Sequence, residues 1–521
     1  MASYRSSALR YAIIVALGGF IFGLDAALIS GTVRFITTEF GLSDMQVGAV
    51  VAAPGFGVIF ALLATGHICN KLGRKKALII IAALYLVSAV SSVIAPNFEA
   101  LVAARFLGGL AFTSLSVASM YIGEVAPANM RGKLVSMNQI NIVLGLSAAY
   151  FANYTILQAS NSGAEWVESV GLATYTWRWM LGVEIVPAAI WLVLLLTVPE
   201  SPRWLILEGR KDEAKTVMRT VMPEEEIDPQ IKSIEESAHH GHKDRSLKAQ
   251  IADLFDRRIR AAMLLGFTVA FLQPITGINA IMFYAPTVFE QVGIGTDAAF
   301  MQSVIVGLVS VVSTAIALLL IDRLGRRPLM LVGLGAAAAS LFACAWGFYN
   351  ATYLLDSAAI NSLAGSFDAS SLQPLANIEF TSDVAFKNAA REALGMEVVR
   401  ANESTLLEQA IRIDAALVLL AITGFIAAFH LSIGPIMWVL FSEIFPIHVR
   451  GIAIPCFALV TSIVNYMVQQ LFLWQLNNMG AGKIFLFYAI CITIGVIIIA
   501  RLMPETKNKS IEEIEASLSK P

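Results

Sequence analysis

The stretch EVAPANMRG, residues 124–132, decides the fold of this chain, because the sequence repeats its pattern as EIFPIHVRG at residues 443–451. Both copies read Glu-x-x-Pro-x-x-x-Arg-Gly. Two further motifs recur in the same order around them. These are NKLGRKKAL (70–78) with DRLGRRPLM (322–330), and PES (199–201) with PET (504–506). Three different motifs that recur in the same order in both parts of the chain indicate an internal duplication, since similar loops alone would not keep that order.

The composition places both copies in a membrane. Hydrophobic residues make up 57% of the chain and charged residues only 14%, unlike a soluble domain. The apolar residues form runs that can each cross a bilayer, which takes about 20 residues. The sequence predicts twelve such spans, at 10–31, 48–69, 77–95, 100–122, 135–157, 177–198, 259–290, 299–321, 328–350, 411–440, 452–475 and 483–503. We therefore expect an all-α membrane protein with two pseudo-symmetric six-helix halves, an arrangement typical of transporters.

The distribution of Lys and Arg predicts the orientation of the spans. Loops on one side hold most of these residues, namely KLGRKK (71–76), Arg131, Lys133, RLGRR (323–327) and Arg450. The short loops on the other side hold Arg34, Lys483 and almost no other positive charge. Positive loops stay in the cytoplasm, so we expect a multi-pass protein of the cell membrane with both termini cytoplasmic. The first span is too long for the apolar region of a cleavable signal peptide.

The spacing of the repeated motifs predicts the domain organisation. The second half is longer than the first between its third and fourth spans, where a polar insertion faces the outside, part of it helical (388–400). A charged, helix-prone segment joins the halves and is expected to form a cytoplasmic helical domain. The predicted units are 1–198 (first half), 199–258 (linker domain), 259–503 (second half, with the outer insertion 351–410) and 504–521 (cytoplasmic tail).

No motif in the chain indicates a metal, a cofactor or an enzyme. The four cysteines have no paired spacing, and the cluster HHGH (239–242) lies in a polar linker, which favours a solvated loop. GAGK (480–483) lacks the first glycine and the Ser or Thr of a phosphate-binding loop. We expect the lipid bilayer as a partner and no nucleic acid, and we expect the chain to be monomeric.

The repeated loops predict charge pairs at the cytoplasmic ends of the spans. Glu124 with Arg131, and Glu443 with Arg450, offer opposite charges at one surface, beside Arg74 and Arg326 of the Gly-Arg loops. Such pairs could hold the inner ends of the two halves together and release them during transport. Anchoring to anionic lipid headgroups is the alternative. Repetition of the acid–base pairing in both halves favours the gate.

Polar residues at mid-depth predict a binding cavity. QPITGIN (273–279) and IGPIMW (433–438) interrupt apolar runs, and broken helices are tolerated at depth only where they face protein or a water-filled cavity. Amides and an aromatic platform suit a neutral polyhydroxylated ligand. A single amide is more often an interhelical contact, but the group favours a cavity. Its members are Gln139, Gln273, Asn279, Asn465 and Trp438.

The run GGFIFGLDAALISG (18–31) carries a carboxylate, Asp25, near the middle of an apolar helix. Arg105, in AARFLGG, is the other strongly ionised residue that we expect deep in the first half. Intramembrane charges usually face the bundle interior and pair with one another. The pair could be purely structural, or it could bind the transported proton; we favour proton coupling.

These motifs resemble those of the sugar porters of the major facilitator superfamily over nearly the whole chain. The matching residues are FGLDAALISG (22–31), GRKK (73–76), ARFLGGL (104–110), EVAPANMRG (124–132), MNQ (137–139), PESPRW (199–204), GIN (277–279), DRLGRR (322–327), GPIMW (434–438), SEIFPIHVRG (442–451) and PET (504–506). The resemblance implies the major facilitator fold and uptake of monosaccharides or polyols. It also implies that Asp25 carries the proton and pairs with Arg105. The implied sugar contacts are Gln139, Gln273, Asn279, Trp438 and Asn465, with Phe22 lining the cavity.

Departures from the family pattern leave the substrate open. The chain has Gln273-Pro274 where the family usually has two glutamines, and it has Leu24, Phe283, Ser462 and His430 where tyrosine, tyrosine, tryptophan and an acidic residue are usual. The long outer insertion resembles the proton–myo-inositol branch. We therefore expect proton-coupled symport of a hexose, pentose or myo-inositol. A passive uniporter of the same substrates is the alternative, and a non-transporting nutrient sensor is less favoured because the cytoplasmic tail is short.

Overall fold

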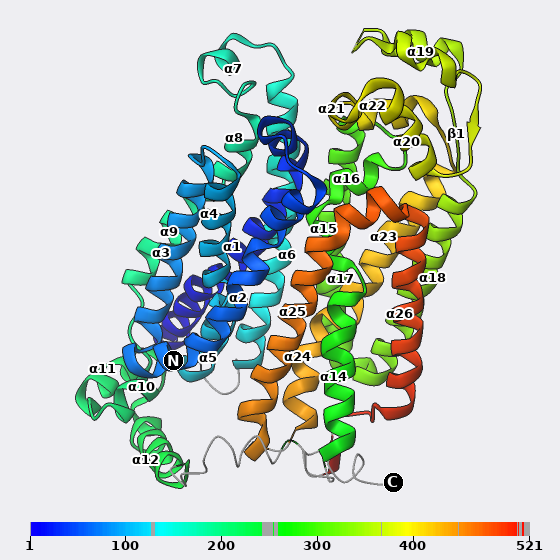
Figure 1. Ribbon diagram of the computed structural model, residues 1–521. Helices are drawn as coiled ribbons and strands as arrows, with labels where there is room; N and C mark the ends of the chain where they lie inside the picture. Colours follow the sequence, from blue (N-terminus) through cyan, green and yellow to red (C-terminus); the bar gives the residue numbers. More distant parts are fainter. Residues whose placement is uncertain are drawn as a thin grey trace.

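The computed structural model describes residues 2–126, 131–241, 254, 259–365, 367–445, 447–507, 509 and 513–514. Within these residues the chain forms twelve helical spans that are long and apolar enough to cross a membrane, and they stand side by side as a bundle in Figure 1. The predicted all-α membrane fold with twelve spans is confirmed. Large apolar side chains such as Leu63 and Leu420 are more than two-thirds exposed, as expected of a surface that faces lipid.

The spans of the first half are six helices or pairs of helices: α1 (Ala2–Phe40), α2 (Asp44–Leu72), α3 (Arg74–Val93), α4 (Phe98–Ala111) with α5 (Ser114–Val125), α6 (Arg131–Ser160), and α8 (Thr176–Gly182) with α9 (Ile185–Leu196). Those of the second half are α14 (Arg260–Ile275) with α15 (Ile278–Phe283), α17 (Thr296–Leu324), α18 (Arg326–Tyr349), α23 (Ala415–Leu431) with α24 (Ile433–Ile444), α25 (Ile447–Met479) and α26 (Ala481–Leu502). Short helices α7 (Glu165–Ser169) and α16 (Ala285–Glu290) lie in connections.

Four of these spans are broken. The interruption predicted at 273–279 is confirmed, since α14 ends at Ile275 and α15 begins at Ile278. Gly277 between them has φ 82°, a left-handed conformation that glycine adopts without steric penalty. The helix before IGPIMW ends at Leu431, and a single residue, Ser432, separates it from α24. Breaks free backbone polar groups at depth, so they mark the places where a polar site can form.

Two glycines bring α1 against α6 at close range. A Cβ added to Gly23 would lie 1.9 Å from the carbonyl oxygen of Ile142, and one added to Gly145 would lie 1.9 Å from that of Phe20. Small residues at facing positions let helix backbones approach closely in membranes. This contact fixes the height and rotation of α1, and therefore the position of Asp25, which follows Gly23 by two residues.

The two polar segments outside the bundle fold as separate small units. The linker forms α10 (Pro202–Leu207), α11 (Lys211–Val221) and α12 (Glu224–Gly241) around an apolar core that includes Trp204, Met218 and Ile231. Most of the remaining linker up to 258, the side chains of HHGH (239–242), and most of the tail after 509 lie outside the described residues. The helix-prone character predicted for the linker agrees with the helices that it forms up to Gly241.

The insertion contains a small sheet that the sequence analysis did not predict. Strands β1 (Thr352–Leu354), β2 (Glu379–Phe380) and β3 (Ile411–Arg412) form an antiparallel sheet in the order β2-β1-β3, with Tyr353 opposite both Phe380 and Ile411. The other elements are α19 (Ser357–Leu363), the 3-10 helix η2 (Ala369–Leu375), α20 (Asp383–Leu394), α21 (Met396–Ala401) and α22 (Glu403–Ala410). The helix expected at 388–400 is split, because Gly395 (φ 86°) ends α20.

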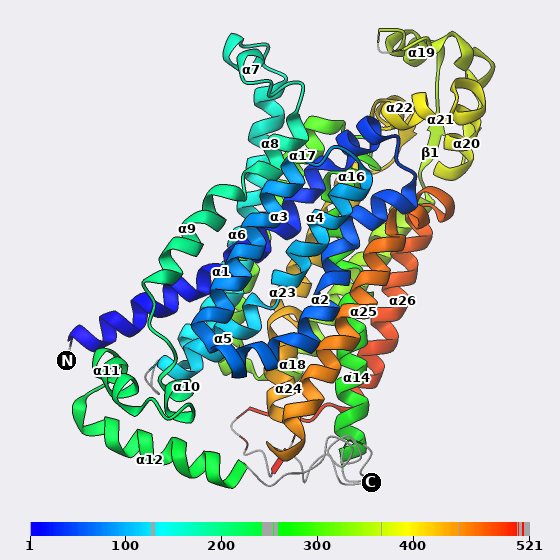
Figure 2. The same cartoon turned by 60° about the vertical axis from the view of Figure 1, so that its left-hand side comes forward.

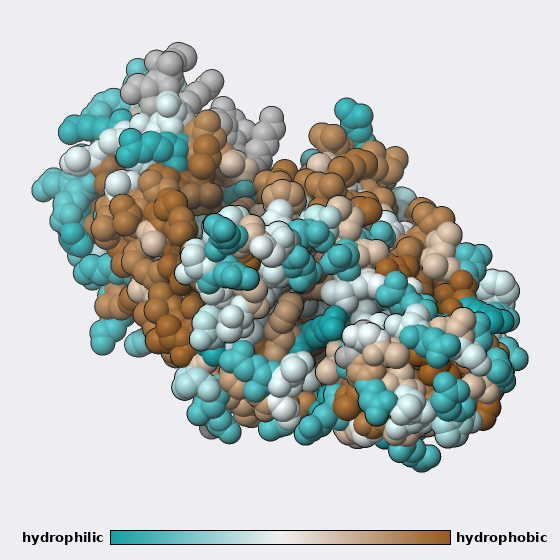
Figure 3. Space-filling view, turned by 90° about the horizontal axis from the view of Figure 1, so that it is seen from above, coloured by the Kyte–Doolittle hydropathy of each residue, from teal (hydrophilic) through white to brown (hydrophobic). Residues whose placement is uncertain are grey.

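The bundle has two distinct ends. We call the end that carries α10–α12 the inner face, and the start of α1 and the end of α26 lie toward it in Figures 1 and 2. The opposite end, which carries residues 351–410, is called the outer face. Seen from the outer face in Figure 3, hydrophilic side chains cover much of the surface and hydrophobic ones gather along parts of the flanks. This distribution fits a bundle whose sides face lipid and whose ends face water.

The break at Gly277 provides a test of the fold. A Cβ at this position would meet the ring of the buried Tyr488 at 2.3–2.8 Å, and the backbone is left-handed, so Gly277→Ala should destabilise the protein by about 1–3 kcal/mol. The melting temperature of the detergent-solubilised protein should fall. Gly335→Ala on α18 is the matched control, because a Cβ there meets nothing within 4 Å. Equal melting temperatures of the two variants would contradict the account of the break.

Candidate functional site

A buried ion pair joins α1 to α4 in the first half. The Nη1 of Arg105 donates to Oδ1 of Asp25, and the two residues are only 2% and 1% exposed. A pair held this far from water interacts strongly, but each charge has also lost its hydration. Among the described residues, Asp25 Oδ2 and Arg105 Nε have no hydrogen-bond partner. The hydrogen-bonding groups of this pair are therefore only partly satisfied, which is unusual for a purely structural contact.

A second carboxyl group, Glu184, lies beside this pair, so the expectation of only two deep ionisable residues in the first half was wrong. Glu184 stands in the break between α8 and α9 and is 3% exposed. Its side chain interacts with both Asp25 and Arg105, and its Oε1 has no hydrogen-bond partner among the described residues. Two carboxyl groups and one guanidinium thus share one dry site, which we call the carboxyl site.

The charges of the carboxyl site do not balance when both acids are ionised. One guanidinium neutralises one carboxylate, and the second carboxylate would leave an uncompensated negative charge in a low-dielectric interior. A proton on either acid removes that charge and supplies a donor for an unpartnered oxygen. The arrangement can therefore bind and release a proton as the surroundings of Asp25 and Glu184 change.

The expected sugar contacts lie on several spans. Asn279 on α15 donates through Nδ2 to Oδ1 of Asn465 on α25 at 2.8 Å, which brings two members of the set together across two helices. Gln139 on α6 and Gln273 on α14 are partly exposed, and among the described residues their side chains form no hydrogen bond with another member. Partly exposed amides within a span need water or a ligand as partners, since lipid offers none.

The two aromatic members of the set lie in different halves. Phe22 on α1 packs edge-on against Phe112, at the α4–α5 break, with 4.6 Å between ring centroids. Trp438 on α24 packs edge-on against Phe441 at 5.8 Å and is 46% exposed. A half-exposed indole leaves one face free for an apolar ligand surface.

At the inner face of the first half, the three repeated motifs meet in one network. Arg74 forms a two-pronged ion pair with Glu124, through Nη2 at 2.9 Å and Nε at 3.0 Å. Ser201 Oγ donates to the same carboxylate at 2.5 Å. Glu200 accepts from the backbone N–H groups of Arg74 and Lys75 at 2.9 and 3.0 Å, so its carboxylate caps the N-terminus of α3.

The second half repeats this network residue for residue. Arg326 pairs with Glu443 at 3.1 Å, and Thr506 Oγ1 donates to Glu443 at 2.6 Å. Glu505 accepts from the backbone N–H groups of Arg326 and Arg327, each at 3.1 Å, and so caps α18. Each partner in the first network has a counterpart in the second, which explains why the three motifs recur in both halves.

The pairing expected within each Glu-x-x-Pro-x-x-x-Arg motif requires correction. Glu443 pairs with Arg326 rather than Arg450, whose guanidinium donates to the carbonyl oxygen of Phe445 at 3.0 and 3.3 Å. Glu124 likewise pairs with Arg74, and the side chain of Arg131 lies outside the described residues. Each described network joins spans of one half only. The contacts therefore make each half rigid at its inner end and do not bridge the halves in this state.

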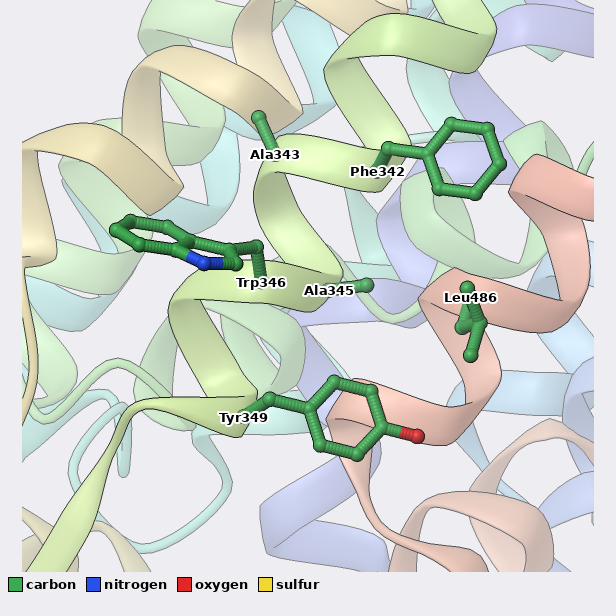
Figure 4. A pocket seen from close by; sticks show the side chains of 6 residues that line it. All are labelled: Phe342, Ala343, Ala345, Trp346, Tyr349 and Leu486. Carbon is green, nitrogen blue, oxygen red and sulfur yellow. The ribbon is translucent and has the colours of Figure 1, made fainter.

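A surface hollow between α18 and α26 is separate from the carboxyl site, the expected sugar contacts and the inner charge networks. Figure 4 shows its lining, which consists of Phe342, Ala343, Ala345, Trp346, Tyr349 and Leu486. The lining is apolar apart from the Tyr349 hydroxyl, and Trp346 is 62% exposed on the flank of the bundle. It lacks the convergent donors and acceptors that a sugar needs.

Comparisons with known proteins agree with this architecture. The family described as "Sugar (and other) transporter" matches residues 11–367 and 394–518. The arabinose-proton symporter of Bacillus subtilis is 31% identical over 98% of this chain and 96% of its own length. The galactose-proton symporter of Escherichia coli is 31% identical over 97% of this chain and 93% of its own. The partially occluded inward-open structure of the xylose transporter XylE from E. coli has a TM-score of 0.73 and 28% identity, covering 97% of this chain and 100% of that one.

This chain belongs to the sugar transporter family. Its members move solutes across membranes and are not enzymes. The chain is a multi-pass membrane protein with twelve spans in its described part.

The transporter is closed on its outer face. Between described residues, the hydrogen bonds and ion pairs that join the two halves all lie on the outer side of the bundle. They link Arg34 with Thr296 and Ala401, Arg400 with Leu42 and Asp44, Gln470 with Met45, and Tyr150 with Met282. Two halves joined at one end only are the arrangement that a rocking transporter adopts when that end is closed.

The capping carboxylate Glu505 generates a pH-dependent prediction. Burial alone would raise its pKa, yet the backbone N–H groups of Lys507, Arg326 and Arg327 donate to the carboxylate and hold the pKa below its ordinary value. Because the folded-state pKa is lowered, Glu505 contributes its full stability above its ordinary pKa of about 4.3 and loses it as the pH falls.

Glu505→Gln should therefore lower the melting temperature at pH 7, with a loss of about 1 kcal/mol, and its difference from the unmodified protein should shrink when the pH is lowered to about 3. The exposed Glu225 on α12 provides the control, since Glu225→Gln should leave melting unchanged at both pH values. A difference that stays constant with pH would exclude the charge of Glu505 as the cause.

Proposed function

We propose that this transporter carries a neutral monosaccharide or cyclitol together with protons by alternating access. The observation that supports the proposal most is the carboxyl site, in which Asp25, Arg105 and Glu184 share one dry environment. A transporter that moves a neutral sugar without a coupling ion has no need of two buried carboxyl groups, whose desolvation is costly. The alternative of a passive uniporter leaves these groups without a role.

Asp25 acts as the proton carrier in this proposal. When ionised it pairs with Arg105, and when protonated it releases the guanidinium and carries no charge. Glu184, which faces the same pair, can hold the proton or share it with Asp25 through a carboxylic acid–carboxylate hydrogen bond. Movement of the halves changes the distance between these groups, so that the proton is bound on one side of the membrane and released on the other.

The substrate binds between the halves through four amide side chains. Gln139, Gln273, Asn279 and Asn465 donate to and accept from hydroxyl groups, while Trp438 and Phe22 cover the apolar face of the ring. No basic cluster accompanies them, which argues against an anionic ligand. Relatives named for arabinose, galactose and xylose support a pentose or hexose, and the enlarged outer insertion keeps myo-inositol as an alternative.

We further propose that the inner face is cytoplasmic, as the positions of Lys and Arg predict, and that the monomer is the transporting unit. The gating residues then form two sets, Glu124, Arg74 and Arg131 in the first half and Glu443, Arg326 and Arg450 in the second. The pairs Arg74–Glu124 and Arg326–Glu443 tie the inner ends of spans within their own halves, so that each half moves as one body when the inner face opens or closes.

Replacement of Asn279 tests the substrate site. Asn279→Ala removes the partner of Asn465 and leaves the part-buried amide of Asn465 unpaired, which costs about 1–3 kcal/mol, so the affinity for sugar should fall about five- to a hundredfold. Equilibrium binding of a panel of labelled pentoses, hexoses and myo-inositol measures this. Asn478→Ala, at an exposed position of α25, the helix that carries Asn465, is the control. Unchanged affinity of Asn279→Ala would remove Asn279 from the site.

Replacement of Asp25 tests the coupling. Asp25→Asn resembles the protonated acid permanently, so it should abolish accumulation against a sugar gradient while leaving exchange of labelled for unlabelled sugar largely intact. Both are measured in the same proteoliposomes, with an imposed pH gradient and without one. Asp297→Asn, at the exposed start of α17, should accumulate sugar normally. If Asp25→Asn still concentrates sugar when the outside is acidic, the proton travels by another route.

A further inference from the structure

The outer insertion is fastened to the second half by a buried charge cluster. Lys387 on α20 is 1% exposed, and its Nζ lies 2.6 Å from Oε1 of Glu403 on α22 and 2.7 Å from Oε1 of Gln291, which follows α16. Gln291 Nε2 in turn donates to Glu403 at 3.2 Å. Three polar side chains that satisfy one another in a buried position fix the insertion to α16.

A second attachment joins the insertion to α26. The carboxylate of Asp383, at the start of α20, accepts from the backbone N–H of Ala481 at 3.2 Å, the first residue of α26. Inside the insertion, Tyr353 of β1 stacks on Phe386 of α20 with 5.7 Å between ring centroids, so the unit has its own core. The insertion therefore moves as part of the second half.

Two arginines connect this rigid unit to the first half, one from each side. Arg400, in the last turn of α21, donates to the carbonyl oxygen of Leu42 at 2.8 Å and to Asp44 at 3.4 Å. Arg34, on α1, donates to the carbonyl oxygen of Ala401 at 3.1 Å and to Thr296 at 2.8 Å. Leu42 lies in the connection from α1 to α2 and Asp44 is the first residue of α2. Figure 1 shows α21 above α16. The donors reach in opposite directions, so the contact is reciprocal.

These bonds depend on the state of the transporter. Opening of the outer face requires the outer ends of the two halves to separate, and a hydrogen bond is lost once its atoms part by more than about 0.5 Å beyond contact distance. The attachments of the insertion to the second half, through Lys387 and Asp383, remain when the outer face opens. The arginine contacts therefore stabilise the outer-closed state relative to the outer-open state, which is the condition for shifting a population.

We propose that the insertion 351–410 is an outer latch, which closes across both halves through Arg400 and Arg34 and sets the fraction of molecules that can load substrate from outside. The proposal rests on alternating access alone and is independent of proton coupling. A latch that favours the outer-closed state lowers the apparent affinity for external substrate, because only the outer-open fraction binds it. It also favours return of the empty transporter to the inner-open state.

The distance between the two halves at the outer face tests the latch. Spin labels are placed by Glu165→Cys on α7 and Glu397→Cys on α21, both exposed, in a chain whose four cysteines are replaced, and the distance distribution is measured by electron–electron double resonance. Arg400→Gln should raise the ratio of outer-open to outer-closed molecules about five- to thirtyfold, the range expected for loss of one charge-assisted contact. Arg34→Gln should act in the same direction.

Arg34→Gln also guards against a folding artefact, because it breaks the contact from the first half and leaves the insertion unchanged. Arg412→Gln, at an exposed position of β3, is the matched control and should keep the original distribution. The external concentration of sugar at half-maximal exchange, measured without a pH gradient, should fall in both latch variants. Distance distributions of Arg400→Gln and Arg34→Gln that match that of Arg412→Gln would overturn the latch. A distance shift without any sugar exchange would instead contradict the proposed function.

Discussion

The charge balance between Asp25, Arg105 and Glu184 is the constraint on which the rest of this transporter depends. Two acids and one guanidinium are almost completely removed from water, where an uncompensated charge is strongly disfavoured. One proton makes the site neutral. Any movement that separates Arg105 from its acids, or that admits water to one of them, therefore changes the proton affinity. In the mechanism that we propose, the conformational cycle and proton binding are therefore linked through this electrostatic balance.

The fold keeps that balance sensitive to the relative position of a few helices. Close backbone contact at Gly23 and Gly145 fixes α1 on α6, while Glu184 occupies the break between α8 and α9. At the inner face, matching networks around Glu124 and Glu443 tie together the ends of spans within each half. We propose that rigid halves, one of which holds the charged site, convert a rocking motion into a change in the surroundings of Asp25. At the outer face the contacts cross between halves, and these are the contacts that must break for opening.

Much of the fold could be predicted from the sequence, because hydrophobic run length and the order of the repeated motifs are local properties. The same holds for Asp25 and Arg105, which stand out in apolar helices, although their role in coupling stays a proposal. Glu184 was missed because it sits near a helix break, and the sequence does not tell whether such a residue faces solvent or the interior. A carboxylate inside the predicted span 177–198 was the available signal.

The partners of Glu443 and the small sheet could not be predicted for different physical reasons. Arg450 is close to Glu443 along the chain, whereas its actual partner Arg326 comes from another span, and only tertiary packing decides between them. PES and PET were recognised as repeats, yet their capping role required the position of Glu200 and Glu505 against α3 and α18. The strands of the insertion are two or three residues long, too short to show the alternation that identifies a strand.

The lumenal pH of proteoliposomes during sugar entry tests the central claim most directly. Vesicles with equal pH on both sides and an entrapped pH indicator receive external sugar, and the membrane potential is clamped to zero. If sugar and protons move together, entry of the sugar acidifies the lumen at a rate proportional to the sugar flux, and a protonophore abolishes the change. Measurable sugar entry with a constant lumenal pH would contradict the proton-coupled account.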